Sequence, residues 1–407
     1  MRVHLRTFGC RANHYDTEAV RAMAVAAGHE VVDDDADADL AIVNSCAVTA
    51  EAERDARKAI RRTAARKADV RTVVMGCASA LPAGAATLRA LPTVERVVAG
   101  ADLQALADVL GADTSLAQTS WQRSARAVLR IQDGCDEHCT FCVTTLARGA
   151  NRSRPPDALV REAQQLAEHH PEIVLTGTHI GTYGADIDST LGALVETLVA
   201  CVPAVRFRLS SVEATEVDER LAELLAADAT RVTPYLHAPL QSGSDRVLRR
   251  MGRHWYTADS YARSIERLCA RRSVFGLGAD VIVGFPGETE ADFAATVSLV
   301  RQLPFTYLHV FPYSPRPGTS APRLRDAVSP ALARERAAVL RSISDEKAAA
   351  YQRGRDGSLA DIVVTGGASE PTGMTEDFLT IALASARPRG DRFAARLVVK
   401  QGSLIAA

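Results

Sequence analysis

The sequence lacks any uninterrupted apolar run of the ~20 residues that a membrane-spanning helix needs. Its first residues, MRVHLRTFGC, predict a strand and contain no apolar core of signal-peptide length. We therefore expect a cytoplasmic protein with no membrane partner.

The sequence also lacks a dominant charge. Its 407 residues include 48 Lys and Arg and 49 Asp and Glu, so the formal net charge is −1. This balance gives no indication that the whole chain binds nucleic acid, and only local basic segments could do so. The composition, 47% hydrophobic and 24% charged, is typical of a globular protein, and the length predicts two or three domains.

A nucleotide-binding glycine fingerprint is absent as well. The run GFPGET at 284–289 has neither GxGxxG nor Walker spacing. We interpret it as a turn at the end of a strand, with Thr289 capping the helix that follows.

The chain contains eight cysteines. Without an export signal, they favour metal ligation by reduced thiols over disulfides. Cys201 and Cys269 lie within apolar helical patterns, so we expect them to be small buried side chains. The other six fall at strand ends or in loops, namely Cys10, Cys46, Cys77, Cys135, Cys139 and Cys142.

The segment 134–149, GCDEHCTFCVTTLARG, has the spacing C-x3-C-x2-C. Three thiolates leave one iron of an iron-sulfur cube without a protein ligand, and a substrate or cofactor can occupy that position. The segment resembles the cluster loop of radical S-adenosylmethionine (SAM) enzymes. The alternative is a zinc loop with His138 or a distant cysteine as the fourth ligand.

The N-terminal third alternates strands and helices, which predicts a parallel α/β sheet. A helix is expected from about Asp16, as its N-cap, to Gly28, and Thr49 is expected to cap a second helix. Cys10, Cys46 and Cys77 each follow a strand. Because ligands bind at the carboxyl ends of such strands, we predict that these thiols converge on a second cube. The alternative is three unrelated buried cysteines.

Basic side chains are concentrated in the predicted helix 49–68, TAEAERDARKAIRRTAARKA. Arg54, Lys58, Arg61 and Arg62 fall on one helical face. They indicate either phosphate binding or an ordinary solvated face.

From about residue 121 to 348 the pattern contains six βα units, which predict an incomplete barrel. The cysteine loop follows the first strand, and chemistry in such barrels lies at the carboxyl ends of the strands. Glycines there allow close backbone approach, and Glu or Gln can bind ribose hydroxyls or an amine. The candidate SAM contacts are Thr176, Gly177, Ser211, Glu213, Gln241 and Asp280. Each could instead be a turn residue or a satisfied polar group of the core.

The last part changes to four short strand segments, ADIVVTG, DFLTIALAS, RFAARLVVKQG and SLIAA, with Gly-rich turns, which predicts a small β-barrel. Its second half is basic, so RNA binding and a merely soluble surface are both open. The predicted fold class is therefore α/β, with an N-terminal parallel α/β domain (1–112), a central partial (β/α)6 barrel (121–348) and a C-terminal β-barrel (349–407). A polar linker is expected at about 112–124.

Taken together, this order of parts resembles the radical SAM methylthiotransferase family over nearly the whole chain. The matching strings include TFGCRANHYDTE, VNSCAVTAEAERDARKAIRR, MGCAS, RLSSVEATE, HAPLQSGSDRVLRRM and DVIVGFPGETE. The family acts on isopentenyladenosine in tRNA, on threonylcarbamoyladenosine in tRNA, or on an aspartate of a ribosomal protein. RxNxYxTE after Cys10, the basic helix and THIGTYGAD most resemble the threonylcarbamoyladenosine branch. The C-terminal part resembles the TRAM RNA-binding domain.

The resemblance implies two 4Fe-4S clusters and SAM as cofactors. Cys135, Cys139 and Cys142 would hold the cluster that binds SAM, and Cys10, Cys46 and Cys77 the auxiliary cluster that carries sulfur. The implied reaction is methylthiolation of C2 of threonylcarbamoyladenosine at position 37 of the tRNA anticodon loop, with electrons from a flavodoxin-type donor. A two-cluster electron-transfer or sensor protein, and a structural zinc protein with RNA-binding domains, are the alternatives from other classes.

Overall fold

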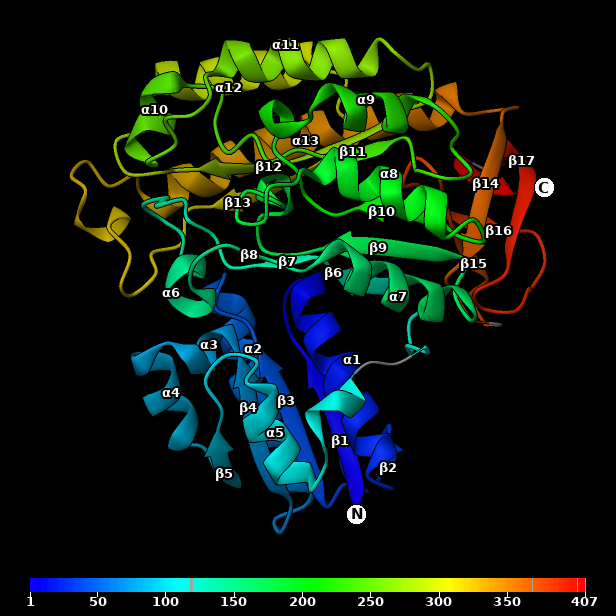
Figure 1. The fold of residues 1–407 in the computed structure, drawn as a ribbon. Helices are drawn as coiled ribbons and strands as arrows, with labels where there is room; N and C mark the ends of the chain where they lie inside the picture. Colours follow the sequence, from blue (N-terminus) through cyan, green and yellow to red (C-terminus); the bar gives the residue numbers. More distant parts are fainter. Residues whose placement is uncertain (118–119, 368, 401, 407) are drawn as a thin grey trace.

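The computed structural model describes residues 1–117, 120–367, 369–400 and 402–406. An N-terminal α/β unit lies below a larger α/β unit, and a small β-barrel packs beside the larger one (Figure 1). This arrangement confirms the predicted fold class. Within the described residues, no helix is both long enough and apolar enough to cross a membrane.

The N-terminal unit is built on a five-stranded parallel sheet in the order β2-β1-β3-β4-β5. Its strands are β1 (Arg2–Thr7), β2 (Glu30–Val32), β3 (Leu40–Ser45), β4 (Arg71–Gly76) and β5 (Val94–Val97). Its helices are α1 (Arg11–Ala26), α2 (Ala50–Arg66), α3 (Cys77–Ala80), α4 (Pro82–Arg89) and α5 (Leu103–Leu110). Because β1, β3 and β4 are adjacent and parallel, the residues that follow them meet at one edge.

Helix α1 begins earlier than the sequence pattern indicates. We expected Asp16 to be its N-cap, but Cys10 occupies that position and the helix ends at Ala26. Asp16 lies within the helix and is only 1% exposed. Arg130 and Arg148 of the central unit pair with its carboxylate, so a tertiary contact explains this aspartate. Thr49 caps α2 as expected, by accepting a hydrogen bond from the Ala52 amide.

The central unit is an incomplete barrel of six parallel strands. They are β6 (Ala127–Arg130), β9 (Glu172–Thr176), β10 (Arg206–Leu209), β11 (Tyr235–His237), β12 (Gly276–Val283) and β13 (Tyr307–Pro312). They form two three-stranded sheets, which the bridges Phe207 to Val232 and Ser211 to His237 connect. In the part of the chain that the structure describes, β6 does not pair with β13, so one side of the barrel is open.

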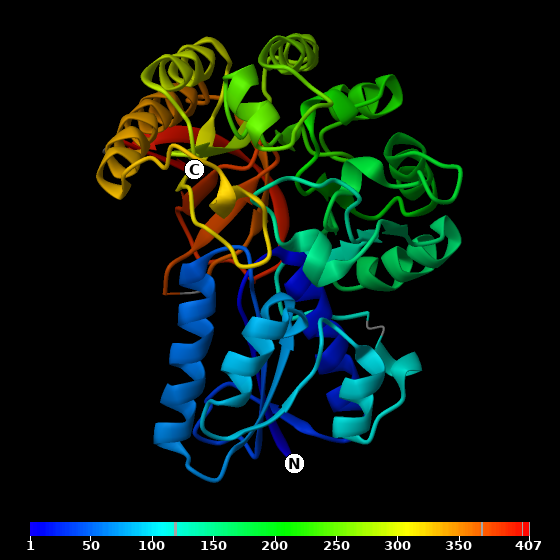
Figure 2. The ribbon, with the colours of Figure 1, turned by 90° about the vertical axis from the view of Figure 1, so that its left-hand side faces the viewer.

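Helices cover the outside of this barrel in an arch (Figure 2). They are α7 (Pro156–Ala167), α8 (Leu191–Cys201), α9 (Glu219–Ala226), α10 (Asp245–Arg250), α11 (Ala258–Cys269), α12 (Glu290–Gln302) and α13 (Pro330–Gly354). The cysteine loop lies between β7 (Gln132–Asp133) and α6 (Thr144–Arg148), and β7 pairs with β8 (Arg152–Ser153). Within the predicted linker, Thr114–Ala117 form a 3-10 turn, and positions 118–119 lie outside the described residues.

The C-terminal unit is a closed barrel in the order β14-β15-β16-β18-β17. Its strands are β14 (Leu359–Val364), β15 (Thr372–Thr375), β16 (Thr380–Leu383), β17 (Arg392–Lys400) and β18 (Ser403–Ala406). The sequence pattern predicted four strand segments and missed β15. That strand reads TGMT and carries no apolar run that would reveal it.

A buried ion network joins the two barrels. Glu172, at the start of β9, is fully buried and accepts hydrogen bonds from Arg206 Nε at 2.8 Å and Arg208 Nε at 2.7 Å. Arg208 also donates to the carbonyl oxygens of Thr375 at 2.9 Å and Glu376 at 3.1 Å. Burial would raise the pKa of Glu172, but the arginines hold it well below its usual value. The carboxylate therefore orders both arginines that reach into the small barrel.

We predict that Glu172→Gln lowers the free energy of unfolding by about 3–5 kcal/mol, because it leaves buried guanidinium groups without their counter-charge. Thermal denaturation checks this. Since the folded-state pKa lies below the unfolded one, the stabilisation is present at neutral pH and is lost as the pH falls through the folded-state pKa. The difference between the two proteins should therefore shrink in acid.

Glu196→Gln is the matched control. The Glu196 carboxylate pairs with Arg220 at 3.3 Å, but both side chains are more than half exposed. We expect a change below about 0.5 kcal/mol there. Equal melting temperatures for wild type and Glu172→Gln would contradict the role given to Glu172.

Candidate functional site

The cysteine loop after β7 places three half-buried thiols in distinct surroundings. Cys135 Sγ lies 3.5 Å from His179 Nδ1, and Cys139 Sγ lies 3.4 Å from Arg253 Nη1. Cys142 Sγ accepts a hydrogen bond from the Thr144 amide at 3.4 Å. Burial raises the pKa of Cys139 to about 12, against the opposing effect of Arg253. Each sulfur thus has a neighbour suited to a thiolate or a sulfide.

The structure brings the other three cysteines together at the carboxyl edge of the N-terminal sheet. Asn13 Oδ1 lies 3.9 Å from Cys10 Sγ and 3.7 Å from Cys77 Sγ. Gly9 has φ +102°, and a Cβ there would lie 2.8 Å from Cys46 Sγ. Glycine is therefore required for the loop to pass this close to Cys46. Burial raises the pKa of Cys77 to about 11.

Neither trio has the geometry of a single-ion site. Tetrahedral ligation of zinc at 2.3 Å brings sulfurs to ~3.8 Å from one another. Of the described residues, the groups whose ligand atoms lie within 4.8 Å of one another are His237, Asp280 and His309, and His179, Glu213 and Glu216, without any cysteine. His138, the alternative zinc ligand, is exposed. Two sets of three spaced thiols fit iron-sulfur cubes better than zinc.

Arg148 connects the two trios, a role that no sequence pattern predicted. It ends α6, the helix that follows Cys142, and its Nε donates to Cys77 Sγ at 3.4 Å. Its Nη2 donates to Asn13 Oδ1 at 2.7 Å and to Asp16 at 2.9 Å. Val143 and Cys77 pack in the same apolar cluster. The two cysteine sets therefore face one another across the boundary between the units.

The predicted SAM contacts fall into two groups. Glu213 is 7% exposed and binds Arg253, which in turn contacts Cys139, so it lies directly behind the cysteine loop. A Cβ on Gly177 would lie 2.5 Å from the carbonyl oxygen of Gln132, whose side chain donates to the Gly134 carbonyl at 2.6 Å. The backbone of Gly177 is thus held against the strand that leads into the loop.

The remaining predicted residues lie further along the strand ends. The Thr176 side chain is 2% exposed, whereas Ser211 is exposed. Gln241 has φ +63°, an uncommon backbone conformation for a residue other than glycine. Asp280 contacts His237 Nε2 at 3.0 Å and His309 Nδ1 at 3.2 Å. The structure therefore places Asp280 among histidines of the barrel interior.

His179 is a site residue whose role no sequence pattern predicted. Its ring lies between Cys135 and Glu216, 2.7 Å from Glu216 Oε1. Burial would lower the pKa of His179, but the contacts with Cys135 and Glu216 outweigh it and raise the pKa to about 10. The only local signal was its place after a strand end, within THIGTYG.

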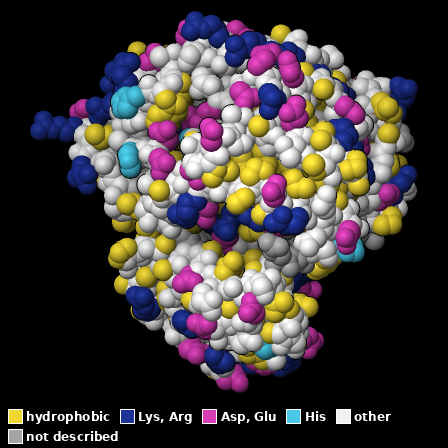
Figure 3. Space-filling model, viewed as in Figure 1, with side chains coloured by type: hydrophobic (Ala, Val, Ile, Leu, Met, Phe, Trp, Pro, Cys, Tyr) yellow, Lys and Arg dark blue, Asp and Glu magenta, His cyan; other side chains and the backbone are white. Residues whose placement is uncertain are grey.

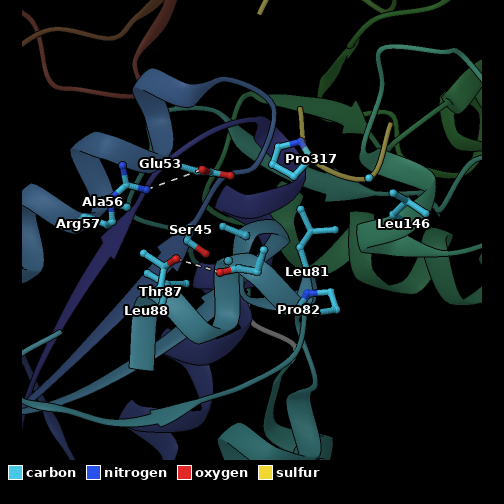
Figure 4. A pocket seen from close by; sticks show the side chains of 14 residues that line it. Ser45, Glu53, Ala56, Arg57, Leu81, Pro82, Thr87, Leu88, Leu146 and Pro317 are labelled. Carbon is cyan, nitrogen blue, oxygen red and sulfur yellow. Dashed lines mark hydrogen bonds and ion pairs between the residues drawn. The ribbon is translucent and has the colours of Figure 1, made fainter. Parts of the chain in front are cut away.

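Two cavities flank the cysteines. One of about 450 Å³ has a largely apolar lining that includes Leu81, Pro82, Leu146 and Pro317 (Figure 4). None of the six cysteines lines it. The other cavity, of about 430 Å³, has Cys77 and several arginines in its lining. Basic side chains are also visible in Figure 3 on the surface between the N-terminal and central units. The cavity that reaches Cys77 is thus the polar one, and the apolar cavity does not open onto any of the six cysteines.

Comparisons with known proteins agree with this geometry. Residues 2–100 match the model of "Uncharacterized protein family UPF0004", and residues 129–300 match the radical SAM superfamily. A structure of the radical S-adenosylmethionine methyltransferase TsrM from Kitasatospora setae aligns with a TM-score of 0.59 over 85% of this chain and 89% of that chain. The identity is 17%, so this likeness concerns the fold. The fold and the cysteine loop together define a radical SAM protein.

Closer relatives give the family. The threonylcarbamoyladenosine tRNA methylthiotransferase MtaB of Bacillus subtilis is 36% identical over 384 residues, 89% of this chain and 84% of the relative. The MtaB protein of Aquifex aeolicus is 31% identical, over 94% of this chain and 96% of its own length. The chain belongs to the family of threonylcarbamoyladenosine tRNA methylthiotransferases.

We predict that Arg148→Met loosens the contact between the N-terminal and central units, because Asp16 and Asp133 lose a charge partner that is 7% exposed. The loss should be about 3–5 kcal/mol of local stability. Amide hydrogen exchange should then quicken in residues 9–17, relative to wild type.

The neighbouring Arg152→Met is the control. Arg152 is exposed and donates to the carbonyl oxygens of Arg148 and Ala150. Its loss should leave the exchange of residues 9–17 unchanged. Equal exchange rates for wild type and Arg148→Met would show that Arg148 does not hold the units together.

Proposed function

We propose that this chain methylthiolates C2 of N6-threonylcarbamoyladenosine at position 37 of the tRNA anticodon loop. The observation that carries the proposal is the convergence of two cysteine trios on either side of Arg148. The reaction replaces an unreactive C2–H bond with a C2–S bond, so it needs both a strong hydrogen abstractor and a holder for sulfur. The names of the relatives specify threonylcarbamoyladenosine in tRNA.

In our proposal, each trio holds one 4Fe-4S cluster. When bound, the two clusters would supply the chemistry, one by reductive cleavage of SAM and the other by carrying the sulfur that is transferred, with its methyl group coming from a second SAM. Cys135, Cys139 and Cys142 hold the SAM-binding cluster, and Cys10, Cys46 and Cys77 hold the auxiliary cluster. The donor sets fit, because three thiolates per cube leave one iron free for SAM or for sulfur.

The protein groups behind the cysteine loop position this chemistry. Arg253 places a positive charge beside Cys139, and Glu213 holds that guanidinium. Among the other predicted SAM contacts, Thr176, Gly177 and Ser211 lie at the ends of β9 and β10, where the loop opens. Gln241 and Asp280 lie at β11 and β12. We propose that Thr176, Gly177 and Ser211 face SAM, together with Glu213 and Gln241. Asp280, which we also predicted as a SAM contact, is assigned in this proposal to the nucleoside instead.

The three parts have separate tasks in this proposal: residues 1–112 hold the auxiliary cluster, 121–348 the SAM-binding cluster, and 349–407 contact RNA. Helix α2 contributes exposed cations. Lys58, Arg61 and Arg62 have no ion-pair partner among the described residues, whereas Arg66 pairs with Asp34. Arg392 of the small barrel is less available, because it binds Asp361 at 2.6 Å.

An anticodon loop is single-stranded, so adenosine 37 reaches a pocket without melting of a duplex. Since mature tRNA is the substrate, we propose a cytoplasmic enzyme. A flavodoxin-type protein is the electron donor that we propose for SAM cleavage.

The decisive experiment is nucleoside analysis of tRNA. Deletion of the gene should remove the methylthio form of threonylcarbamoyladenosine from total tRNA and leave the unthiolated nucleoside, and the wild-type gene should restore it. Loss of the methylthio form of isopentenyladenosine instead would assign the chain to a different substrate.

We predict that Cys139→Ala abolishes reductive SAM cleavage, whereas Cys46→Ala keeps cleavage and stops methylthiolation. Removing either whole trio should lower the iron content by about four atoms per chain. Measurements of 5′-deoxyadenosine, methylthio nucleoside and iron check these outcomes.

Cys201→Ala is the control. We expected Cys201 to be buried, but it is exposed, because it is the last residue of α8, and it lies outside both trios. It should change none of the three readouts. If Cys46→Ala abolished SAM cleavage as completely as Cys139→Ala, the division of labour between the trios would be wrong.

A further inference from the structure

The inner face of strand β13 is open. Residues alternate between the two faces of a strand, so Tyr307, His309 and Phe311 share one face and Leu308 and Val310 the other. Leu308 and Val310 are buried under the helices, whereas the His309 side chain is 54% exposed and Phe311 is 41% exposed. An aromatic face is therefore accessible within the partial barrel, where a core strand would ordinarily be covered.

Hydrogen bonds fix the polar groups beside this face. Asp280 joins His309 at 3.2 Å and His237 at 3.0 Å. His237 Nδ1 lies 2.8 Å from the Tyr307 hydroxyl, which lies 2.6 Å from the Tyr235 hydroxyl. Burial would raise the pKa of Asp280, but the two histidines hold it well below its usual value. These groups satisfy one another, and the chain of contacts leads from the open face toward Tyr235.

Arg11 is the cation at the end of this chain of contacts. It is the first residue of α1, follows Cys10, and lies with its guanidinium carbon 5.8 Å from the centre of the Phe378 ring. Its guanidinium lies close enough to Tyr235 and Tyr307 to act electrostatically on both hydroxyl groups. Within the described ranges, no carboxylate lies within ion-pair distance of Arg11, although its side chain is half-buried.

The neighbouring charges do not neutralise Arg11. Arg126 and Arg208 lie nearby, and Glu172 is already bound by them. A half-buried cation with no counter-charge is costly unless a ligand supplies one. The site therefore has a place for an anion next to an aromatic face.

We propose that Arg11 pairs with the carboxylate of the threonylcarbamoyl group, and that the open face of β13 receives the rest of the nucleoside. This rests on the proposed function and adds how the substrate is distinguished. An α-carboxylate is ionised at neutral pH. Phe311 and His309 offer rings on which an unstacked base can lie. Because Arg11 follows Cys10, the substituent is held beside the trio that we assign to the sulfur-carrying cluster.

The test compares two anticodon stem-loops that differ at one group. One carries threonylcarbamoyladenosine at position 37, and the other carries its uncharged threonine-amide analogue. We expect the wild-type protein to bind the first about 10- to 100-fold more tightly, the range for a hydrogen bond to a charged group. Arg11→Met should abolish this preference by weakening binding of the first RNA alone, and Arg11→Lys should restore part of it. The readout is the dissociation constant, measured without SAM.

Arg334→Met is the matched control, because Arg334 is exposed on α13. It should retain the wild-type preference. If Arg11→Met weakened both RNAs equally, or neither, Arg11 would not be the carboxylate partner. Turnover of the wild-type protein separates the two proposals. If the wild-type enzyme methylthiolates the threonylcarbamoyladenosine RNA but Arg11→Met keeps the binding preference, only the proposed Arg11 subsite is overturned. A wild-type enzyme that leaves this RNA unmodified overturns the proposed function.

Discussion

The contact of Arg148 with Cys77, Asn13 and Asp16 is the constraint on which the site depends. A guanidinium has several donors in a rigid plane, so one side chain can fix the distance and the angle between two loops. Here it fixes the cysteine loop of the barrel against the cysteine edge of the N-terminal sheet. Chemistry that needs a hydrogen abstractor and a sulfur carrier at one carbon atom requires such a fixed separation.

Buried arginines also form the second boundary, between the central barrel and the small C-terminal barrel. Glu172 orders Arg206 and Arg208, and Arg208 binds carbonyl oxygens of the small barrel. Buried arginines thus join the central barrel to both of its neighbours. Each boundary contains directional polar contacts, which set orientation more strictly than apolar contacts alone would. The geometry of the site therefore depends on the orientation of all three units. Arg11 of the N-terminal unit, for example, lies close to Tyr235 and Tyr307 of the central unit.

Much of this architecture was predictable from local patterns. The alternation of strands and helices, the Thr49 cap and the cysteines after strand ends predicted a parallel sheet with thiols at one edge, because these signals depend on neighbours in the sequence. The pattern failed at Asp16, which is a good N-cap residue by type but pairs with distant arginines. It also missed β15, whose residues TGMT have no apolar alternation.

The sequence by itself determined the two sets of three cysteines, the order of the three parts and the partial barrel, since spacing and periodicity are properties of the chain. Only the tertiary structure decided which side chains lie between the two cysteine sets and beside the nucleoside site that we propose. Arg148, His179 and Arg253 are unremarkable by position, and contacts far along the chain give them their roles. Arg11 is the same case. Among the described residues it has no counter-charge, and this is a property of the folded surroundings, because only folding decides which carboxylates lie within reach.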